Sequence, residues 1–370
     1  MSGIIQTKKL TLTPGSVRGR IGSGFDPRVV TELGCAFATL AGHGPIVVGR
    51  DGRMTGEHYA RSVISAMNSL GREVYALGIV PSATLAVAAR ELGCAGAISI
   101  TPGPLPESWS GLRFFDRNGQ TLSAKSFTRL MQLARAGKFK LARAERIGKF
   151  KMDYSCLGRH IQRVTEIPAI NLMNINRAQF SAVVDCANAG AAAVLPDFLR
   201  CIGVRVTELN CLPGHPFPHT PDIGAAAMKA LSAEVKKRRA DLGIIADADG
   251  SRIGLVDEKG AVVAADKTQA LALRQAVRAH TGSIGAPAGA TLARKLAKQL
   301  EVKVWTTPAD EPSAYTALRA KRSALALGAG GELWYAYGSQ TADALVTAAL
   351  ALSDIAEARQ PLSRTVAELV

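Results

Sequence analysis

The stretch most suggestive of chemistry is residues 98–115, ISITPGPLPESWSGLRFF. It begins like a buried strand and continues into a loop, where catalytic groups commonly sit in α/β proteins. Three prolines, Pro102, Pro104 and Pro106, surround Gly103 before a second strand-like segment follows. Proline fixes φ and removes a backbone donor, whereas glycine offers no side chain. The loop is therefore stiff and poor in hydroxyl groups.

A second pattern, Cys211-x₃-His215-x₃-His219, has ligand types found in zinc sites. Prolines at positions 213, 216 and 218 make this segment an extended loop. Zinc is one interpretation, and an ordinary interdomain loop is the other. We favour the interdomain loop.

Charge indicates an anionic partner. The chain has 45 Lys and Arg against 30 Asp and Glu, a formal charge of +15 and a pI near 9.8. A phosphosugar, a nucleic acid, an acidic polymer or an acidic protein would each fit. In the densest patch, residues 135–151, a repeated GKFK places Phe139 and Phe150 between cations, where they could stack on bases or pack on a partner. A solvated linker pinned by these phenylalanines is the favoured alternative. The basic residues of the patch are Arg135, Lys138, Lys140, Arg143, Arg146, Lys149 and Lys151, opposed only by Glu145.

Apolar runs of strand length alternate with helical patterns along the chain, which predicts βαβ units and parallel sheets. Three successive units have a similar size and element order. The first has strands at 45–51, 72–80 and 95–100 with helices at 56–71, 83–93 and 126–137. The second has strands at 181–190, 204–210 and 242–248 with helices at 191–203 and 225–240. The third has strands at 282–287 and 302–307 with helices at 266–280 and 291–301.

Bulk composition fits a soluble protein with real cores, since 370 residues with 47% hydrophobic content suffice for two to four domains. There is no run of eighteen apolar residues, and the N-terminus MSGIIQTKKL lacks a secretory signal. The six cysteines form no CxxC pair. We therefore expect a cytoplasmic protein without a membrane segment.

Six separated landmarks resemble the α-D-phosphohexomutases, the phosphomannomutase/phosphoglucomutase superfamily, over almost the whole chain. Their common order carries the resemblance, because any one of them alone is a weak signal. They are VVGRDGR, the strand-to-loop junction at Thr101, WSGLRFFDRNGQTLS, GHPFPHTPD (214–222), ADLGIIADADGSRIGLVDEKG (240–260) and GGELW…SQTADALVTAALAL (330–352).

The resemblance implies an α/β fold of three tandem domains with mixed sheets, which we place at 1–150, 151–258 and 259–370. Enzymes of this superfamily add a smaller fourth domain that clamps a phosphate. This chain stops after QPLSRTVAELV, so we expect the fourth domain to be absent. The resemblance also implies a phosphoserine, a magnesium ion held by three aspartates, and sugar-binding loops, all serving phosphoryl transfer.

The phosphoserine loop of the family reads roughly Thr-Ala-Ser-His-Asn-Pro, and this chain has Gly103 at the serine position. Glycine cannot carry a phosphoryl group, so no catalytic residue is assigned. Ser99 or Ser108 could substitute only if the loop moved by several ångströms, whereas phosphoryl transfer tolerates a displacement of about one. A relocated nucleophile is therefore the less favoured alternative.

The metal loop, Asp-x-Asp-x-Asp-Arg in the family, is reduced to Asp247, Asp249, Ser251 and Arg252. Two carboxylates bind Mg²⁺ less tightly than three. Either a weak magnesium site remains, or the loop is a structural turn in which both aspartates accept backbone hydrogen bonds and pair with Arg252. We favour the turn and expect no cofactor.

The sugar-binding loop, Gly-Glu-x-Ser-Gly-His in the family, keeps Glu332, which could still accept a sugar hydroxyl, but bulky residues follow it. In the family, an arginine near the N-terminus and a basic residue after the serine loop hold the phosphoryl region. Residual anion- and sugar-binding candidates are therefore Arg18, Arg50, Arg53, Arg113, which replaces the usual lysine, and Glu332. For Arg50, Asp51 and Arg53 the slightly favoured alternative is that they tie the first domain to its neighbours by ion pairs.

Together these losses predict a catalytically inactive phosphohexomutase-like protein that acts by binding, as a scaffold or regulatory component linked to sugar-nucleotide or polysaccharide synthesis. Its partner would be another protein or a second copy of itself. One alternative is a divergent phosphosugar mutase or phosphotransferase with residual activity. Another, less favoured, is a binder of nucleic acid or another polyanion through residues 135–151.

Overall fold

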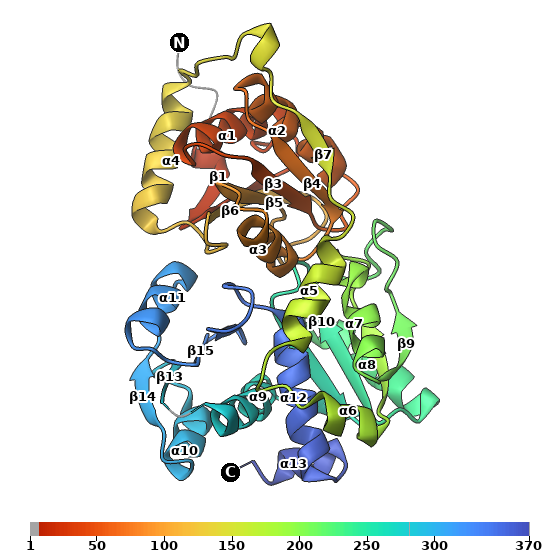
Figure 1. Ribbon diagram of the computed structural model, residues 1–370. Helices are drawn as coiled ribbons and strands as arrows, with labels where there is room; N and C mark the ends of the chain where they lie inside the picture. Colours follow the sequence, from red (N-terminus) through yellow and green to blue (C-terminus); the bar gives the residue numbers. More distant parts are fainter. Residues whose placement is uncertain (1–6, 281, 370) are drawn as a thin grey trace.

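A computed structural model describes residues 7–280 and 282–369, in which three sheets and their helices form the chain (Figure 1). Each sheet mixes parallel and antiparallel strands, so the predicted α/β fold with mixed sheets is confirmed. Residues 1–6 of the predicted first domain and residues 281 and 370 of the third lie outside the described residues. The sheets use residues within 10–152, 181–263 and 283–335, and the domain boundaries stay predictions.

The first sheet has seven strands, in the order β1-β2-β6-β5-β3-β4-β7. Successive residues of its central strands face opposite helical layers, as the pleat of a strand requires. Val47 packs with α3, whereas Ile46 and Val48 pack with α1, α2 and α4. Its strands are β1 (Leu10–Thr13), β2 (Ser16–Arg20), β3 (Ile46–Arg50), β4 (Val74–Ile79), β5 (Gly96–Ile100), β6 (Trp109–Asp116) and β7 (Phe150–Met152), and its helices are α1 (Pro27–Leu40), α2 (Gly56–Ser69), α3 (Ser82–Glu91) and α4 (Ala124–Ala136).

The second sheet has five strands, in the order β12-β11-β10-β8-β9. The prediction of one continuous helix at 191–203 beside it is wrong. The segment is broken into a 3₁₀ turn, Gly190–Ala193, and the helix α7. Pro196 explains the break, because proline fits the first turn of a helix but not its interior. The elements are β8 (Ser181–Asp185), α7 (Leu195–Cys201), β9 (Arg205–Leu209), α8 (Ala225–Arg238), β10 (Leu242–Ala246), β11 (Ile253–Asp257) and β12 (Val262–Val263).

The third sheet, ordered β14-β13-β15-β16, shares one hydrophobic core with the second through α9 and α12. Residues 344–356 of α12 are all buried, and the helix is apolar on nearly every side, as expected of a helix enclosed within a core. The elements are α9 (Ala265–Ala279), β13 (Ser283–Ala286), α10 (Thr291–Gln299), β14 (Lys303–Thr306), α11 (Glu311–Ala320), β15 (Leu325–Leu327), β16 (Leu333–Tyr335), α12 (Ala344–Ala358) and α13 (Leu362–Ala367).

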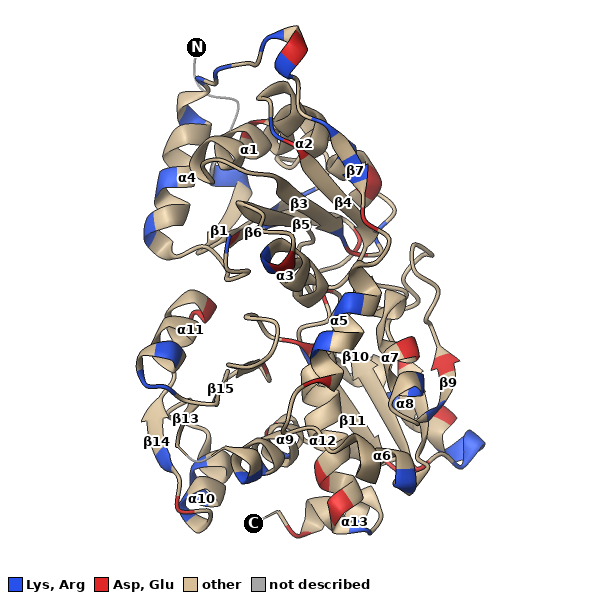
Figure 2. Cartoon of the chain, viewed as in Figure 1, with Lys and Arg blue, Asp and Glu red and all other residues tan. Residues whose placement is uncertain are grey.

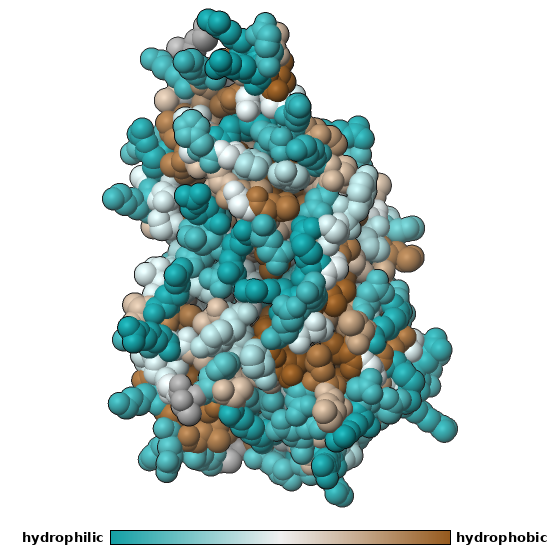
Figure 3. Space-filling view, in the orientation of Figure 1, coloured by the Kyte–Doolittle hydropathy of each residue, from teal (hydrophilic) through white to brown (hydrophobic). Residues whose placement is uncertain are grey.

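Two helices that the sequence did not predict, α5 (Cys156–Thr165) and α6 (Leu172–Ala178), connect the first sheet to the second. In the part of the chain that the structure describes, no helix is long and apolar enough to cross a membrane. The face shown in Figure 3 is mainly hydrophilic, with apolar residues gathered in its lower half. The cytoplasmic location stays a prediction.

A buried chain of polar groups joins α3, α5 and the start of α12. His160 is fully buried, and its Nδ1 lies 2.8 Å from Thr84 Oγ1 while its Nε2 lies 2.9 Å from Asp343 Oδ2. The other oxygen of Asp343 accepts a hydrogen bond from the backbone of Leu345 and so caps α12. These contacts satisfy polar groups that would otherwise be costly to bury.

Replacing His160→Leu should lower the free energy of unfolding by about 3 kcal/mol, because Asp343 and Thr84 would lose their partner inside the core. Urea-induced unfolding measures the effect. The matched control is His58→Leu on the exposed face of α2, where we expect a change within about 0.5 kcal/mol. Equal effects of the two substitutions would contradict this role for His160.

Candidate functional site

Loops from all three sheets line a cleft of about 570 Å³. The first domain contributes the loop after β5 and two arginines on neighbouring strands. The second domain contributes the loop after β10, and the third contributes the start of α11 and the segment before β16. The lining of the cleft includes Arg18, Gly103, Pro104, Arg113, Asp247, Asp249, Ser251, Arg252, Glu311, Glu332 and Trp334.

The loop after β5 is held in shape by a buried arginine. Arg53, 2% exposed, donates to the carbonyl of Gly103 at 3.0 Å and to that of Leu105. Its guanidinium also pairs with Asp51, and burial raises the pKa of that carboxyl although Arg53 opposes the shift. Gly103 has φ +71°, and its N–H donates to Thr101 Oγ1 at 3.0 Å. The loop is thus well ordered without any hydroxyl at position 103.

The expected ion pairs from Arg50 and Arg53 to neighbouring domains are wrong. Arg53 pairs with Asp51, and Arg50 lies 3.7 Å from Glu57, so both pairs stay within the first domain. Arg53 reaches the second domain only by lying over the ring of Phe217, at 5.1 Å from its centroid. The short chain distance between these charged residues explains the local pairing.

The serines proposed as substitute nucleophiles are poorly placed. Ser99 lies within β5 at 2% exposure, with its hydroxyl 3.5 Å from that of Ser82. Ser108 is exposed at the far end of the loop. Neither serine lines the cleft. A relocated nucleophile would therefore require the loop to rearrange.

Asp247 is already saturated by donors from its own loop. Its Oδ1 accepts from the N–H groups of Ser251 and Arg252, at 2.7 and 3.1 Å. Its Oδ2 accepts from Ser251 Oγ and Arg252 Nε, both at 2.8 Å. Burial and the neighbouring Asp249 raise the pKa of Asp247, although Arg252 opposes this. The predicted pairing with Arg252 is found for Asp247.

Asp249 pairs instead with Arg113, so the predicted pairing of Asp249 with Arg252 is wrong. Arg113 Nη1 lies 2.8 Å from Asp249 Oδ2, and Nη2 pairs with Glu311. Burial lowers the pKa of Arg113, but the carboxylates of Glu311 and Asp249 outweigh it and leave that pKa raised. Arg113 also lies 3.4 Å from Thr341 Oγ1. One guanidinium from the first domain thus bonds to both other domains.

The metal loop in this arrangement does not fit Mg²⁺, which takes six oxygens in near-octahedral geometry. Asp247 is saturated, one oxygen of Asp249 is held by Arg113, and Ser251 Oγ donates to Asp247. Within residues 7–280 and 282–369, no group of three or more acidic, histidine or cysteine side chains is placed to hold a metal. We therefore derive no step through magnesium.

In the Cys-His-His pattern, Cys211 and His219 form hydrogen-bond contacts with residues outside the pattern. Cys211 Sγ donates to the carbonyl of Val184 at 3.3 Å, and His219 Nε2 lies 3.1 Å from Asp185. The Asp185 hydrogen bond raises the pKa of His219, although burial opposes it. These contacts favour the interpretation of this segment as an ordinary loop.

Arg18 is the cation that remains available in the cleft. Its Nε is shielded from solvent and has no hydrogen-bond partner among the described residues. Burial and the nearby Arg113 lower the pKa of Arg18, and Asp249 only partly compensates. A Cβ built at Gly103 would lie 3.8 Å from Arg18 Nη2. The guanidinium thus stands beside the position from which a side chain at 103 would project.

The third domain contributes Glu332 and Trp334 to the lining of the same cleft. Glu332 Oε2 accepts from the N–H of Gly330 at 3.0 Å, which folds the carboxylate back onto its own loop. Trp334 is 3% exposed, and its Nε1 has no partner within the described chain. Of the bulky residues that follow Glu332, only Trp334 lines the cleft, whereas Leu333 and Tyr335 pack in the hydrophobic core.

Two family sequence models match the chain. The model for phosphoglucomutase/phosphomannomutase α/β/α domain I matches residues 12–140, and the model for α/β/α domain II matches residues 158–260. The chain belongs to the α-D-phosphohexomutase superfamily. The predicted family is thereby confirmed.

Named relatives of this superfamily member align with about 70% of the chain. A probable phosphoglucosamine mutase of Methanopyrus kandleri is 29% identical over 260 residues, covering 70% of this chain and 56% of the relative. The phosphoglucosamine mutase of Moorella thermoacetica is 32% identical over 272 residues, covering 70% of this chain and 58% of the relative. The matches thus span just over half of these relatives' lengths.

Among solved structures, the fold matches a putative phosphomannomutase from Thermus thermophilus with a TM-score of 0.88 and 21% identity. That comparison covers all of this chain and 84% of the other. A Burkholderia thailandensis phosphoglucomutase/phosphomannomutase family protein gives a TM-score of 0.84 at 22% identity, covering 95% of this chain and 78% of the other. The phosphohexomutase fold therefore extends through all three sheets.

Sequence reasoning placed Arg18, Gly103, Arg113, Asp247 and Asp249 in one site, and all five line the cleft. It missed Glu311, the partner of Arg113, and the hydroxyls of Thr121 and Thr341 that bond to Glu311. The segment around Glu311 shows no motif beyond a helix start, so its role appears only in the folded chain.

Gly103→Ala should lower the free energy of unfolding by about 1 kcal/mol, because a Cβ is strained at φ +71° even though space is open. The matched control is Gly158→Ala in α5, where space is also open and φ is not positive. There we expect a gain of about 0.5–1 kcal/mol. Urea-induced unfolding compares the two, and a loss of the same size at Gly158 would contradict the backbone explanation.

Proposed function

We propose that this protein binds a phosphorylated sugar in the cleft without forming a phosphoenzyme at residue 103, and so acts as a binding or regulatory member of its superfamily. The observation that carries the proposal is the shielded Arg18 Nε, which has no hydrogen-bond partner among the described residues, in a guanidinium beside Gly103. The names of the relatives, phosphosugar mutases, support the class of ligand.

The electrostatics favour an anion at this point. Arg18 and Arg113 are close enough for each to affect the other, and Arg113 is already neutralised by two carboxylates. Within residues 7–280 and 282–369 Arg18 forms no such ion pair, so a phosphate there would compensate a half-buried charge that Asp249 offsets only in part. Arginine holds a phosphate through two parallel N–H donors, which gives both affinity and orientation.

Transfer of a phosphoryl group needs an acceptor oxygen in line and a means of neutralising charge. Position 103 offers no oxygen, and the acidic loop is committed to protein donors. Binding is therefore the chemistry that the described side chains support best. A protein partner, self-association and a link to sugar-nucleotide or polysaccharide synthesis stay predictions.

Calorimetric titration with glucose 1-phosphate, mannose 1-phosphate and glucosamine 1-phosphate tests the proposal. Arg18→Met should weaken binding of a ligand by about ten-fold or more, because a charge-assisted phosphate contact is lost. Unphosphorylated glucose should not bind. The control is Arg20→Met, at the exposed end of the same strand and outside the cleft, where we expect less than about a two-fold change. Equal effects at Arg18 and Arg20, or no binding, would overturn the proposal.

The second candidate function is residual phosphosugar mutase or phosphotransferase activity, which the names of the relatives favour. We expect no interconversion when the protein is incubated with glucosamine 1-phosphate or glucose 1-phosphate, Mg²⁺ and the matching bisphosphate. Mass spectrometry should find no phosphate ester between residues 95 and 115. A stoichiometric ester that sugar phosphate removes would establish the second candidate and reject the binding proposal.

A further inference from the structure

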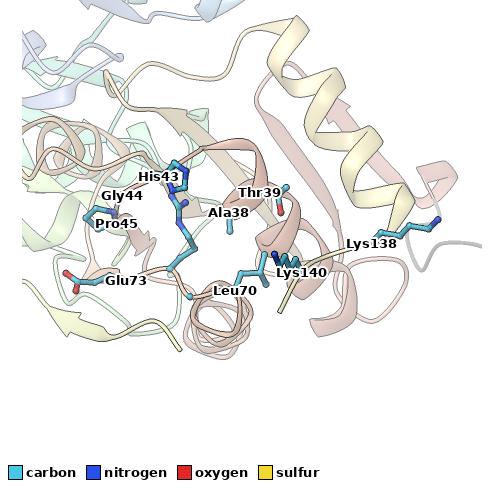
Figure 4. A pocket seen from close by; sticks show the side chains of 11 residues that line it. Ala38, Thr39, His43, Gly44, Pro45, Leu70, Glu73, Lys138 and Lys140 are labelled. Carbon is cyan, nitrogen blue, oxygen red and sulfur yellow. The ribbon is translucent and has the colours of Figure 1, made fainter. Parts of the chain in front are cut away.

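A second cavity lies at the opposite edge of the first sheet from the cleft. The cleft lies at the carboxyl end of β5, whereas this cavity of about 670 Å³ lies at the amino ends of β3 and β4. Its walls come from the end of α1, the turn between α2 and β4, and the segment after α4 (Figure 4). The lining includes Thr39, His43, Leu70, Arg72, Lys138 and Lys140.

Arg72 lines this cavity without a counter-ion. Its Nε and Nη2 are shielded from solvent and have no hydrogen-bond partner within the described residues. Burial lowers the pKa of Arg72. The adjacent carboxylate, Glu73, lies 2.9 Å from the ammonium of Lys151 and is neutralised there. A desolvated cation of this kind gains from an external anion.

Two lysines add charge from the other side of the cavity. Lys140 lies on the side of Leu70 and Thr39, while Lys138 extends away from His43 (Figure 4). Both belong to the connection between α4 and β7, where basic residues gather at the top of Figure 2. Excess positive charge on two walls favours an anion over a cation.

The basic segment is mostly exposed, as expected of a solvated linker, and it is pinned to the first domain. The N–H groups of Ala142 and Gly148 donate to the carbonyls of Ser69 and Asn68, at 2.9 and 2.8 Å. Phe139, between the two lysines, packs against the core of the first domain. These contacts hold Lys138 and Lys140 at the cavity. Phe150, in contrast, is 52% exposed.

We infer that this cavity binds a small phosphate ester of about mononucleotide size, with its phosphates between Arg72 and Lys140. Ala38, Pro45 and Leu70 provide an apolar surface for the remainder of the ligand. The volume lies within the range of small-molecule sites, and arginine with lysine is a common combination for phosphates. The inference concerns a separate site and does not rest on the function proposed for the cleft.

ATP and inorganic pyrophosphate, titrated calorimetrically in metal-free buffer, are the probes. Lys140→Gln and Arg72→Met should each weaken ATP binding by about ten-fold. Lys140 is exposed, so its variant should fold normally. The matched control is Arg143→Gln, on the same segment, exposed and outside the cavity, with less than about a two-fold change expected.

Stability separates a binding role for Arg72 from a structural one. If Arg72 serves a ligand, Arg72→Met should leave the urea midpoint unchanged or raise it, because a desolvated charge is removed. A clear fall in the midpoint with ATP affinity retained would show that Arg72 supports the helix ends instead.

Two other outcomes would overturn the inference. One is that neither probe binds at millimolar concentration. The other is that Arg143→Gln and Lys140→Gln lose affinity equally. Tighter binding of a fifteen-residue oligothymidylate that depends equally on both positions would reveal an open nucleic-acid surface in place of this site.

Discussion

The contact on which the cleft depends is the guanidinium of Arg113 between the carboxylates of Asp249 and Glu311. The three side chains come from three different domains and are largely buried. Removing any one of them would leave a buried charge without its partner, which would destabilise the folded protein. Arginine suits this place because its planar fork reaches two acceptors at once, which a lysine would do less well. The same contact occupies one oxygen of Asp249 in the loop that the superfamily uses for a metal, so the assembly of the domains also engages one of the two carboxylates left in that loop.

The loop at 101–106 is also held in place by contacts with other residues of the chain. Arg53 and Asp51 hold its carbonyls and its threonine from beneath, while prolines restrict its backbone. None of these supports requires a side chain at 103, so the loop keeps its form where the nucleophile is missing. The cleft is therefore pre-formed, with Arg18 as a positive charge that no residue of the described chain neutralises through Nε.

Local patterns in the sequence were enough to predict the βαβ units, the family and the position of Gly103, because strands, helices and ordered motifs depend on neighbouring residues. The pairing of charges was not predictable in this way. Glu311 is 198 residues from Arg113, and His160 is 183 residues from Asp343. These pairs form only when the domains pack together, so the spacing of residues within a short sequence segment does not predict them. For Arg50 and Arg53 the prediction erred in the opposite direction. Ion pairs with neighbouring domains were expected, but their partners lie close in the sequence.

The shared core around α12 has a mechanical consequence. Because the second and third sheets pack on the same buried helix, they form one block. The first domain is held to this block by Arg113 and by the buried contacts of His160 with Thr84 and Asp343. A rotation of the first domain against the block would therefore separate Arg113 from at least one carboxylate and break the His160 contacts. If a phosphate at Arg18 weakened the Arg113 contacts, occupancy of the cleft and the angle between the two halves would be thermodynamically linked.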